Sequence, residues 1–527
     1  MPRLAEFDPA AATDPEAFQG WLAALPADGA ERLKAIGRLL VRFGHREANP
    51  DALVGMLEQV RLALLPAVVD CLAPLEGRQI PYGAEVWRRL ADALTTMRAL
   101  RTMFRRAASR MTREGPAPET GADEPARRAL PLIRALDLQS RILATLLVHR
   151  VEPLSEDWDE FCALGRHARA TGLLDAQVPD ALPLVRPVTA RALFVYPLLL
   201  RLAGLPERSR EDAAAAARLA SRVAAQIGFR VDPGEARPNQ WGPALALTGS
   251  WSARLDTHRV PSILARRRER SPAPGASEAA DALIAELQRR WTGEAGPAPA
   301  ERPPLDGPTH GVLHFGLPRR VEAPERRPQS GPGRAEAGYV FGQWERNTIV
   351  RLSMAGGDER PSLAGADPLA AAEPARFQPN ASGRILVERS LMLPPALLGG
   401  LVALRFDEPA SPVRLGAVQS VEQLATPGYE RIRCHRVSVA LWPGGAAAAG
   451  LRMGAARFFD DAWVLRAQPG GPAARDTLVT APGLVAAGGR AVLREGGRDR
   501  SIRFTAVLER GPGFERVGFV VDDMVED

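Results

Sequence analysis

The hydrophobic residues of this chain change their spacing part-way along its 527 residues. Between about residues 30 and 230 they recur every three or four positions, as in the stripe from Trp87 to Phe104, which places them on one face of a helix. After about residue 341 they alternate, as from Val437 to Leu441, which is the spacing of a half-buried strand. One chain with both periods predicts a multidomain α+β protein, with an N-terminal all-helical array followed by a C-terminal all-β region.

The β region is expected to form a sandwich or a barrel, because its short apolar runs are separated by turns rich in Gly and Pro. One of these runs places Ile502, Phe504, Ala506 and Leu508 on a single buried face. Between the two halves we expect one helix, Glu278 to Trp291, and a short strand within His310 to Phe315. The predicted domains are an all-helical array at 1–230, a mixed segment and Pro/Arg-rich linker at 231–340, a β-barrel at 341–445, and a C-terminal β extension at 446–527 that packs on the barrel.

The basic charge of the chain does not by itself predict a nucleic-acid partner. The net charge is +6, and Lys34 is the only lysine among 68 basic residues, so the rest are arginine. These arginines alternate with acidic residues along most segments, which is typical of a solvated helix surface. We therefore expect nucleic acid to be an unlikely partner, and an arginine-driven nucleic-acid binder stays a minor alternative.

Nothing in the sequence predicts a secreted or membrane-spanning protein. The first eight residues lack the apolar core of a signal peptide, and the apolar run from Ala192 to Gly204 is broken by Pro197 and is too short to span a bilayer. Three scattered cysteines give no disulfide framework and no zinc motif. We expect a cytoplasmic protein without a transmembrane segment.

No catalytic or metal-binding arrangement stands out. Cys434 and His435 are neighbours in an alternating run, so they point to opposite faces of a strand and cannot share one ion. The chain has no Ser-His-Asp arrangement and no phosphate loop, and Trp87 and Trp158 fit a helical core better than a cofactor site. We expect a protein that is not an enzyme and that holds no cofactor or metal.

The stretch from Phe377 to Ile385 (FQPNASGRI), followed by Leu401-Val-Ala-Leu and by Val413 to Val418 (VRLGAV), resembles a divergent branch of the PilZ-domain proteins. In that branch a long helical region precedes a PilZ-like barrel and a further β segment. The resemblance implies a PilZ-like barrel at 341–445 that senses cyclic di-GMP in the bacterial cytoplasm. It makes the protein an effector or adaptor whose helical region binds a protein partner.

PilZ domains hold the dinucleotide with an arginine segment before the first strand and an Asp/Asn-x-Ser-x-x-Gly segment on the barrel. Guanidinium groups form paired charge-assisted bonds to phosphate and stack on guanine, while small residues allow a close approach. The resemblance assigns the second element to Asn380, Ser382 and Gly383, with Arg384 beside them. The basic linker is the candidate source of the arginine element, with Arg326 and Arg327 as candidate ligand residues, because a flexible segment of this length can reach any face of the barrel.

Two departures from the motif leave an alternative open. Ile385 stands where the motif glycine is expected, and no arginine pair ahead of the barrel has the spacing of four residues. A nucleotide-independent scaffold, with a degenerate PilZ-like barrel that contacts proteins, would account for both departures.

Overall fold

The computed structural model describes residues 15–43, 49–75, 80, 82–114, 124–231, 243–247, 251–270, 278–294, 308–317, 369, 372–379, 384–389, 396–407, 411–429, 431–454, 456, 459–467 and 475–522. The chain divides into two compact units. The first consists of Met1–Pro299, Leu386–Leu398 and Gln419–Ser438, and the second of Ala300–Ile385, Gly399–Val418 and Val439–Asp527.

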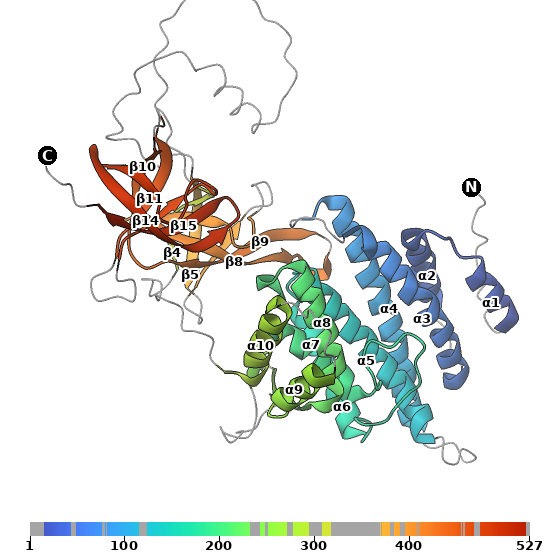
Figure 1. Ribbon diagram of the computed structural model, residues 1–527. Coiled ribbons are helices and arrows are strands. Elements are labelled where there is room, and N and C mark those ends of the chain that lie inside the picture. Colours follow the sequence, from blue (N-terminus) through green and yellow to red (C-terminus); the bar gives the residue numbers. More distant parts are fainter. Residues whose placement is uncertain are drawn as a thin grey trace, which may run out of the picture. The chain divides into compact units, whose positions relative to one another are not determined.

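The first unit contains the predicted helical array (Figure 1). Consecutive helices pack on one another, with α2 on α3 and α4, and α4 on α5. The helices of the array are α1 (Pro15–Ala23), α2 (Gly29–Phe43), α3 (Pro50–Leu72), α4 (Ala84–Glu114), α5 (Glu124–Val148), α6 (Ser155–Ala170), α7 (Ala190–Leu202) and α8 (Arg210–Val223). The expected fold class, a helical array followed by a β region, is confirmed.

The hydrophobic pattern and the capping side chains explain where these helices form and which face they bury. In α4 the whole stripe from Trp87 to Phe104 is buried. The side chains of Thr189 and Ser209 accept hydrogen bonds from the first turns of α7 and α8, which satisfies backbone N–H groups that a helix start otherwise leaves free. Periodicity and capping residues therefore account for this part of the fold.

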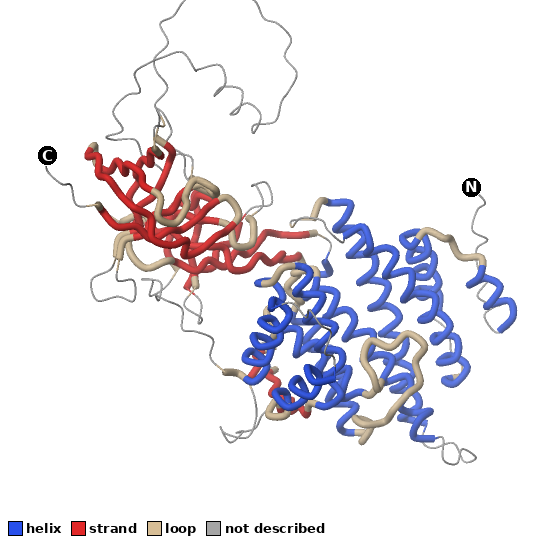
Figure 2. The backbone as a smooth tube through the Cα atoms, in the orientation of Figure 1, coloured by secondary structure: helices blue, strands red, loops and turns tan. Residues whose placement is uncertain are grey.

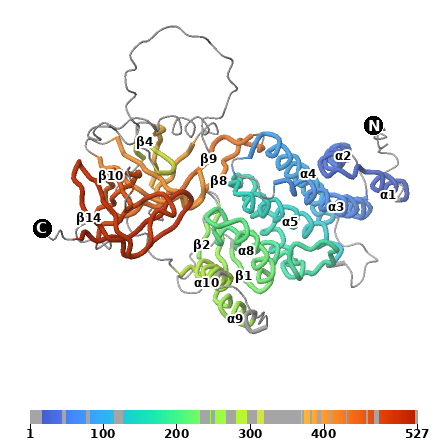
Figure 3. Tube along the Cα trace, turned by 45° about the horizontal axis from the view of Figure 1, so that its top comes forward, coloured from blue at the N-terminus to red at the C-terminus, as the bar shows by residue number. Residues whose placement is uncertain are grey.

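The segment after the array contains more structure than its sequence pattern indicates (Figure 3). The expected helix is present as α10 (Glu278–Thr292), but α9 (Val260–Arg270) and a small antiparallel sheet were not predicted. The sheet consists of β1 (Gly228–Val231), β3 (Ser252–Asp256) and β2 (Ala244–Ala246) in that order. These strands are too short to establish a period of two, and the four arginines of α9 obscure its apolar face.

The described strands of the β region close into two barrels (Figure 2). The first has the strand order β4-β5-β6-β9-β8-β7 and the second the order β10-β11-β12-β15-β14-β13. The first barrel consists of β4 (Thr309–Phe315), β5 (Glu373–Pro379), β6 (Ile385–Arg389), β7 (Leu401–Phe406), β8 (Arg414–Ala425) and β9 (Ile432–Leu441). The second consists of β10 (Ala446–Met453), β11 (Asp460–Leu465), β12 (Thr477–Thr480), β13 (Arg490–Glu495), β14 (Arg498–Gly511) and β15 (Phe514–Val521).

The barrels divide the sequence differently from the predicted segments. The short strand expected within His310 to Phe315 is β4, and it belongs to the first barrel although it lies in the segment 231–340. Residues 446–527, expected as an extension, supply a closed barrel of their own. Each barrel needs strands that pair with both neighbours, and this pairing depends on contacts distant in sequence rather than on the local pattern.

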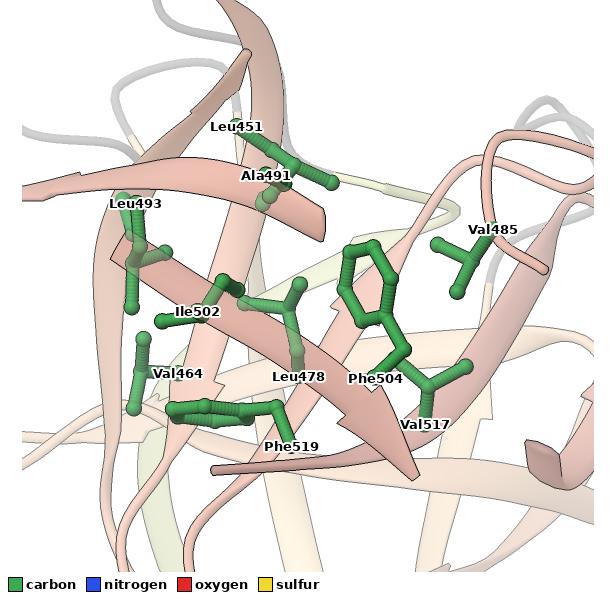
Figure 4. Packing of buried hydrophobic residues seen from close by; sticks show 12 residues of the cluster. Leu451, Val464, Leu478, Val485, Ala491, Leu493, Ile502, Phe504, Val517 and Phe519 are labelled. Carbon is green, nitrogen blue, oxygen red and sulfur yellow. The ribbon is translucent and has the colours of Figure 1, made fainter. Parts of the chain in front are cut away.

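The second barrel is filled by the apolar residues that alternate along its strands. Ile502 and Phe504 point inward among side chains of the neighbouring strands (Figure 4). Ala506 and Leu508 were expected on the same face but are exposed. The register between β14 and β15 shifts between Phe504 and Val507 and again between Val507 and Glu509. These bulges exchange the inward-facing and outward-facing positions of β14 after Phe504, so Val507 packs against the core in place of Ala506 and Leu508.

A second apolar cluster joins residues of both barrels within the second unit. Trp442, at the end of β9, packs against Phe514 of β15 with ring centroids 5.4 Å apart. Leu401 and Leu415 of the first barrel and Trp463 of the second belong to the same cluster. The C-terminal β segment therefore packs on the first barrel as well as closing on itself.

One helical segment of the described residues, Pro50–Leu75, is long and apolar enough to cross a membrane. Half of its most apolar stretch is buried in protein, and Arg61 near its centre is buried in ion pairs with Glu58 and Asp180. These contacts are typical of a core helix. The sequence argument passed over this segment because its charged residues and Pro66 interrupt the apolar run.

Candidate functional site

The predicted nucleotide-binding residues fall mostly outside the described part of the chain. Asn380, Ser382 and Gly383 lie between β5 and β6, and Arg326 and Arg327 lie between β4 and β5, all outside the described residues. Arg384 is described: it directly precedes β6 and is half-buried. The described structure therefore places one predicted site residue, at the start of a barrel strand.

The outer side of β6 and its neighbour β9 carries two arginines that share one carboxylate. Glu388 Oε1 lies 3.1 Å from Arg436 Nη2, and Glu388 Oε2 lies 3.4 Å from Arg433 Nη2. All three side chains are at least one-third exposed. Cys434 lies beside them, and burial raises the pKa of its thiol, so the group is neutral at physiological pH. The cluster carries one surplus positive charge on the strand pair that Arg384 precedes.

The opposite face of the same strands is buried. Arg389 of β6 and His435 of β9 are both buried, which confirms that Cys434 and His435 point to opposite faces. Burial, followed by the charge of Arg389, lowers the pKa of His435 to about 4, so its imidazole is neutral. Its Nε2 atom has no hydrogen-bond partner among the described residues. The described part of the chain contains no group of three His, Cys, Asp or Glu residues that could hold a metal ion.

The turn between β8 and β9 ends in Tyr429, which is buried and contacts helices α4 and α6 within the first unit. Its hydroxyl donates to Asp157 Oδ2 at 2.7 Å and accepts from the backbone N–H of Leu154 at 2.8 Å. The indole Nε1 of Trp87 donates to the backbone carbonyl of Tyr429 at 3.0 Å. Burial and the neighbouring Asp157 raise the pKa of Tyr429, so the phenol keeps its proton.

A guanidinium group completes this contact. Arg98 of α4 donates to both carboxylate oxygens of Asp157, at 2.8 and 2.9 Å, and its Cζ lies 4.5 Å from the centroid of the Tyr429 ring. The Tyr429 backbone has φ of 62°, in the left-handed region that costs a residue with a side chain about 1–2 kcal/mol. Such a conformation persists only where surrounding contacts hold it. We call Trp87, Arg98, Leu154, Asp157 and Tyr429 the tyrosine lock.

Gln423 near the end of β8 forms a second set of contacts with the helical array. Its backbone pairs in parallel with the segment after α5, where its N–H donates to Arg150 O at 2.8 Å and its carbonyl accepts from Glu152 N at 3.1 Å. Its side-chain oxygen accepts from the N–H of Tyr82 at 3.0 Å, and its amide nitrogen donates to His149 O at 3.3 Å. Gln423 is fully buried, and the described contacts satisfy both ends of its amide.

Glu422, the preceding residue, lies near an ion pair of the array. Arg201 binds Glu152 through two contacts of 2.9 and 3.0 Å. Burial, followed by the charge of Glu152, raises the pKa of Glu422 to about 7, and Arg201 opposes this shift. The strand end therefore carries a carboxyl group that exchanges its proton near neutral pH.

Sequence reasoning missed these contacts although it identified some of their residues. Trp87 and Trp158 were predicted to be core residues, and both are buried. The turn Pro427-Gly428 was readable as a break between two strands, but its partner Trp87 lies 342 residues away. The one usable signal was a tyrosine directly after the turn glycine, in a chain with four tyrosines.

Part of the helical array matches a known family. Residues 16–234 match the model of a family described as the N-terminal domain of the cyclic-di-GMP receptor FimW. The matched residues include helices α1–α8 and strand β1, and they contain Trp87, Arg98 and Asp157. Neither the curated proteins nor the solved structures contain a match to this chain. The family match supports a role in cyclic di-GMP signalling.

Proposed function

We propose that this protein is a cyclic di-GMP receptor in which the first barrel binds the dinucleotide and the helical array binds a protein partner. The observation that carries the proposal is the match of residues 16–234 to the N-terminal domain of a cyclic-di-GMP receptor family. The resemblance of Asn380, Ser382 and Gly383 to the PilZ motif, ahead of a strand of a closed barrel, supports the position of the site.

The chemistry of the ligand fits the charges near this position. Cyclic di-GMP carries two phosphates and two guanines, and both are good partners for guanidinium groups. Arg384 would contribute one guanidinium at the start of β6, and Arg433 and Arg436 carry the surplus charge on the outer side of β9. Arg326 and Arg327 are proposed as the second arginine element, on the sequence argument alone.

The response would pass along β9, because this strand neighbours β6 in the first barrel and continues from the turn that holds Tyr429. A ligand that changes the position of β6 would shift the balance of contacts in the tyrosine lock. A ligand changes an equilibrium only by its differential affinity for the two states, so the lock must have a second arrangement with other contacts. The proposal includes no catalytic step and no cofactor, and it places the protein in the cytoplasm.

Isothermal titration calorimetry of the full chain with cyclic di-GMP tests the proposal. We expect Asn380→Ala with Ser382→Ala to abolish binding and Arg384→Ala to weaken it by about tenfold or more, because each charge-assisted bond is worth about 1.5–3 kcal/mol. Arg500→Ala is the matched control, since it removes an exposed arginine from β14 of the second barrel. No heat at tens of micromolar ligand, with the wild-type protein folded, would contradict receptor function.

A nucleotide-independent scaffold is the second candidate, and one observation favours it. Ile385 stands at the position of the motif glycine, and its side chain is fully buried, so the chain does not approach a ligand there as closely as glycine permits. A pull-down with the partner separates the two functions. A receptor should change its partner binding when cyclic di-GMP is added, whereas a scaffold should bind equally with and without it.

A further inference from the structure

A cavity of about 630 Å³ in the first unit is lined by residues of α7, β1 and α9 and of the segments beside them. Its walls include Arg191 at the start of α7, Asp256 at the end of β3, and Arg259 and Arg266 at and within α9. Pockets of 300–1,000 Å³ are typical sites for small molecules. The cavity lies in a part of the chain that neither the barrel site nor the tyrosine lock uses.

The cavity has a surplus of positive charge. Arg259 and Arg266 are both exposed, and both line the cavity: Arg259 from the turn before α9 and Arg266 from within the helix. Neither guanidinium has an ion-pair partner in the part of the chain that the structure describes. Asp256 supplies the one carboxylate of the described cavity wall, and it is bonded to His258.

Arg191 is held differently from the other two arginines. It binds Asp175 through two contacts of 2.6 Å, which raise its pKa and fix its position. Its charge is therefore balanced by a neighbour outside the cavity wall, while those of Arg259 and Arg266 remain available to a ligand. The cavity thus has one rigid arginine and two exposed ones.

The first turn of α9 adds to this preference for anions. Arg259, Ser262 and Ile263 line the cavity, so the helix presents its N-terminal end there. The N-terminus of a helix carries a partial positive charge and free N–H groups that stabilise phosphate. The helix has eleven residues; Arg259 directly precedes it, and Arg266 is its seventh residue.

The wall of the cavity is partly apolar. Ile227 is fully buried, and Gly228 lies so close to Asp256 that an added Cβ would come within 3.2 Å of its Cβ atom. Ile263 of α9 is half-buried at the same cavity. A wall that combines exposed arginines with buried aliphatic side chains suits a molecule with a phosphate at one end and a flat or apolar group at the other.

We propose that this cavity binds a small phosphate-bearing molecule of nucleotide size. The phosphate is bound by Arg259 and Arg266, with the N-terminal end of α9 beside Arg259, and the remainder of the molecule lies over Ile227. The site is separate from the barrel, so it gives the helical array a ligand of its own. It goes beyond the proposed receptor function and does not depend on it.

Calorimetry of the full chain with GMP as the probe tests this site. We expect GMP to bind, guanosine to bind at least about tenfold more weakly, and inorganic phosphate to compete with GMP. Arg259→Glu with Arg266→Glu should weaken GMP by about a hundredfold, because two charge-assisted bonds of roughly tenfold each are lost. The matched control is Arg218→Glu with Arg222→Glu, which makes the same charge change at exposed positions of α8.

Additional variants and a folding check distinguish loss of the site from loss of the fold. Arg259→Ala with Arg266→Ala repeats the test without charge reversal, and circular dichroism checks that each variant is folded. Asn380→Ala with Ser382→Ala should leave GMP binding unchanged, which separates this cavity from the barrel site. The proposal is overturned if GMP binds more weakly than about 1 mM, or if the α9 and α8 variants affect GMP equally.

Discussion

Tyr429→Phe removes the single atom that joins Asp157 and Leu154 in the tyrosine lock. The change deletes the hydroxyl that donates to Asp157 Oδ2 and accepts from the N–H of Leu154, but it keeps the ring over which Arg98 lies. Because phenylalanine has nearly the same shape, it leaves no large cavity. The variant therefore isolates the hydrogen bonds of one turn.

The expected loss in the free energy of unfolding follows from the two groups that lose a hydrogen bond, the carboxylate of Asp157 and the N–H of Leu154. A hydrogen bond to a charged group is worth about 1.5–3 kcal/mol, and a buried N–H without a partner costs about 1–3 kcal/mol. Asp157 keeps both of its bonds to Arg98, so its charge stays paired and the loss falls below the sum of these values. We expect Tyr429→Phe to lower the free energy of unfolding by about 3 kcal/mol.

Urea denaturation followed by far-ultraviolet circular dichroism measures this loss, because the helical signal reports the first unit. The denaturation midpoint should fall while the slope of the transition stays constant. Tyr196→Phe is the matched control: Tyr196 is buried on α7, and its hydroxyl bonds to none of the described residues. We expect the control to lose less than about 1 kcal/mol.

Equal midpoints for Tyr429→Phe, Tyr196→Phe and the wild type would refute the reasoning. That result would mean that the hydroxyl of Tyr429 does not hold the turn in place, and that its left-handed backbone is stabilised by the ring and by Trp87 alone. A large loss in Tyr429→Phe with no loss in the control would support the role of the lock in joining strand β9 to the array.

Other substitutions test other parts of the structure. The pKa of Glu422 is raised from 4.5 to about 7 in the folded state, so the folded protein binds this proton more tightly than the unfolded chain does. The free energy of unfolding should therefore fall as the pH rises from about 5 to 7. Glu422→Gln should flatten this slope in urea titrations at a series of pH values. Burial lowers the pKa of both His149 and His435 to about 4, so stability should fall as pH drops from 6.5 towards 4, and replacing both with Gln should make the fall shallower. Asp180→Asn should cost about 3–5 kcal/mol by the same denaturation assay, because Asp180 is bound by two buried arginines at 2.7 and 2.8 Å. Gly311→Ala should lower the melting temperature of the barrels and reduce the free energy of unfolding by about 3 kcal/mol or more, because the new Cβ would clash with the carbonyl oxygen of Arg405. An unchanged melting temperature would mean that β4 can shift.

The site was only partly predictable from the sequence. The resemblance led to Asn380, Ser382, Gly383 and Arg384 between β5 and β6, and of these four residues the structure describes Arg384. The surplus charge of Arg433 and Arg436 was not predicted, because it arises where β6 lies beside β9 and two arginines share Glu388. The cavity beside α9 was missed for the same reason, since its arginines come from separate segments of the chain.

The sequence by itself determined the local structure of this protein. Hydrophobic periods of 3.6 and 2 placed the buried stripe of α4 and the inward residues of β9, because burial of one face selects that spacing. The tertiary structure decided which strands close each barrel, where bulges turn β14 over, and that Tyr429 lies against Trp87. These features depend on pairings between distant residues, and no local pattern encodes the partner of a strand end or of a buried hydroxyl. Their energy comes from desolvated contacts that exist only once the whole chain has folded.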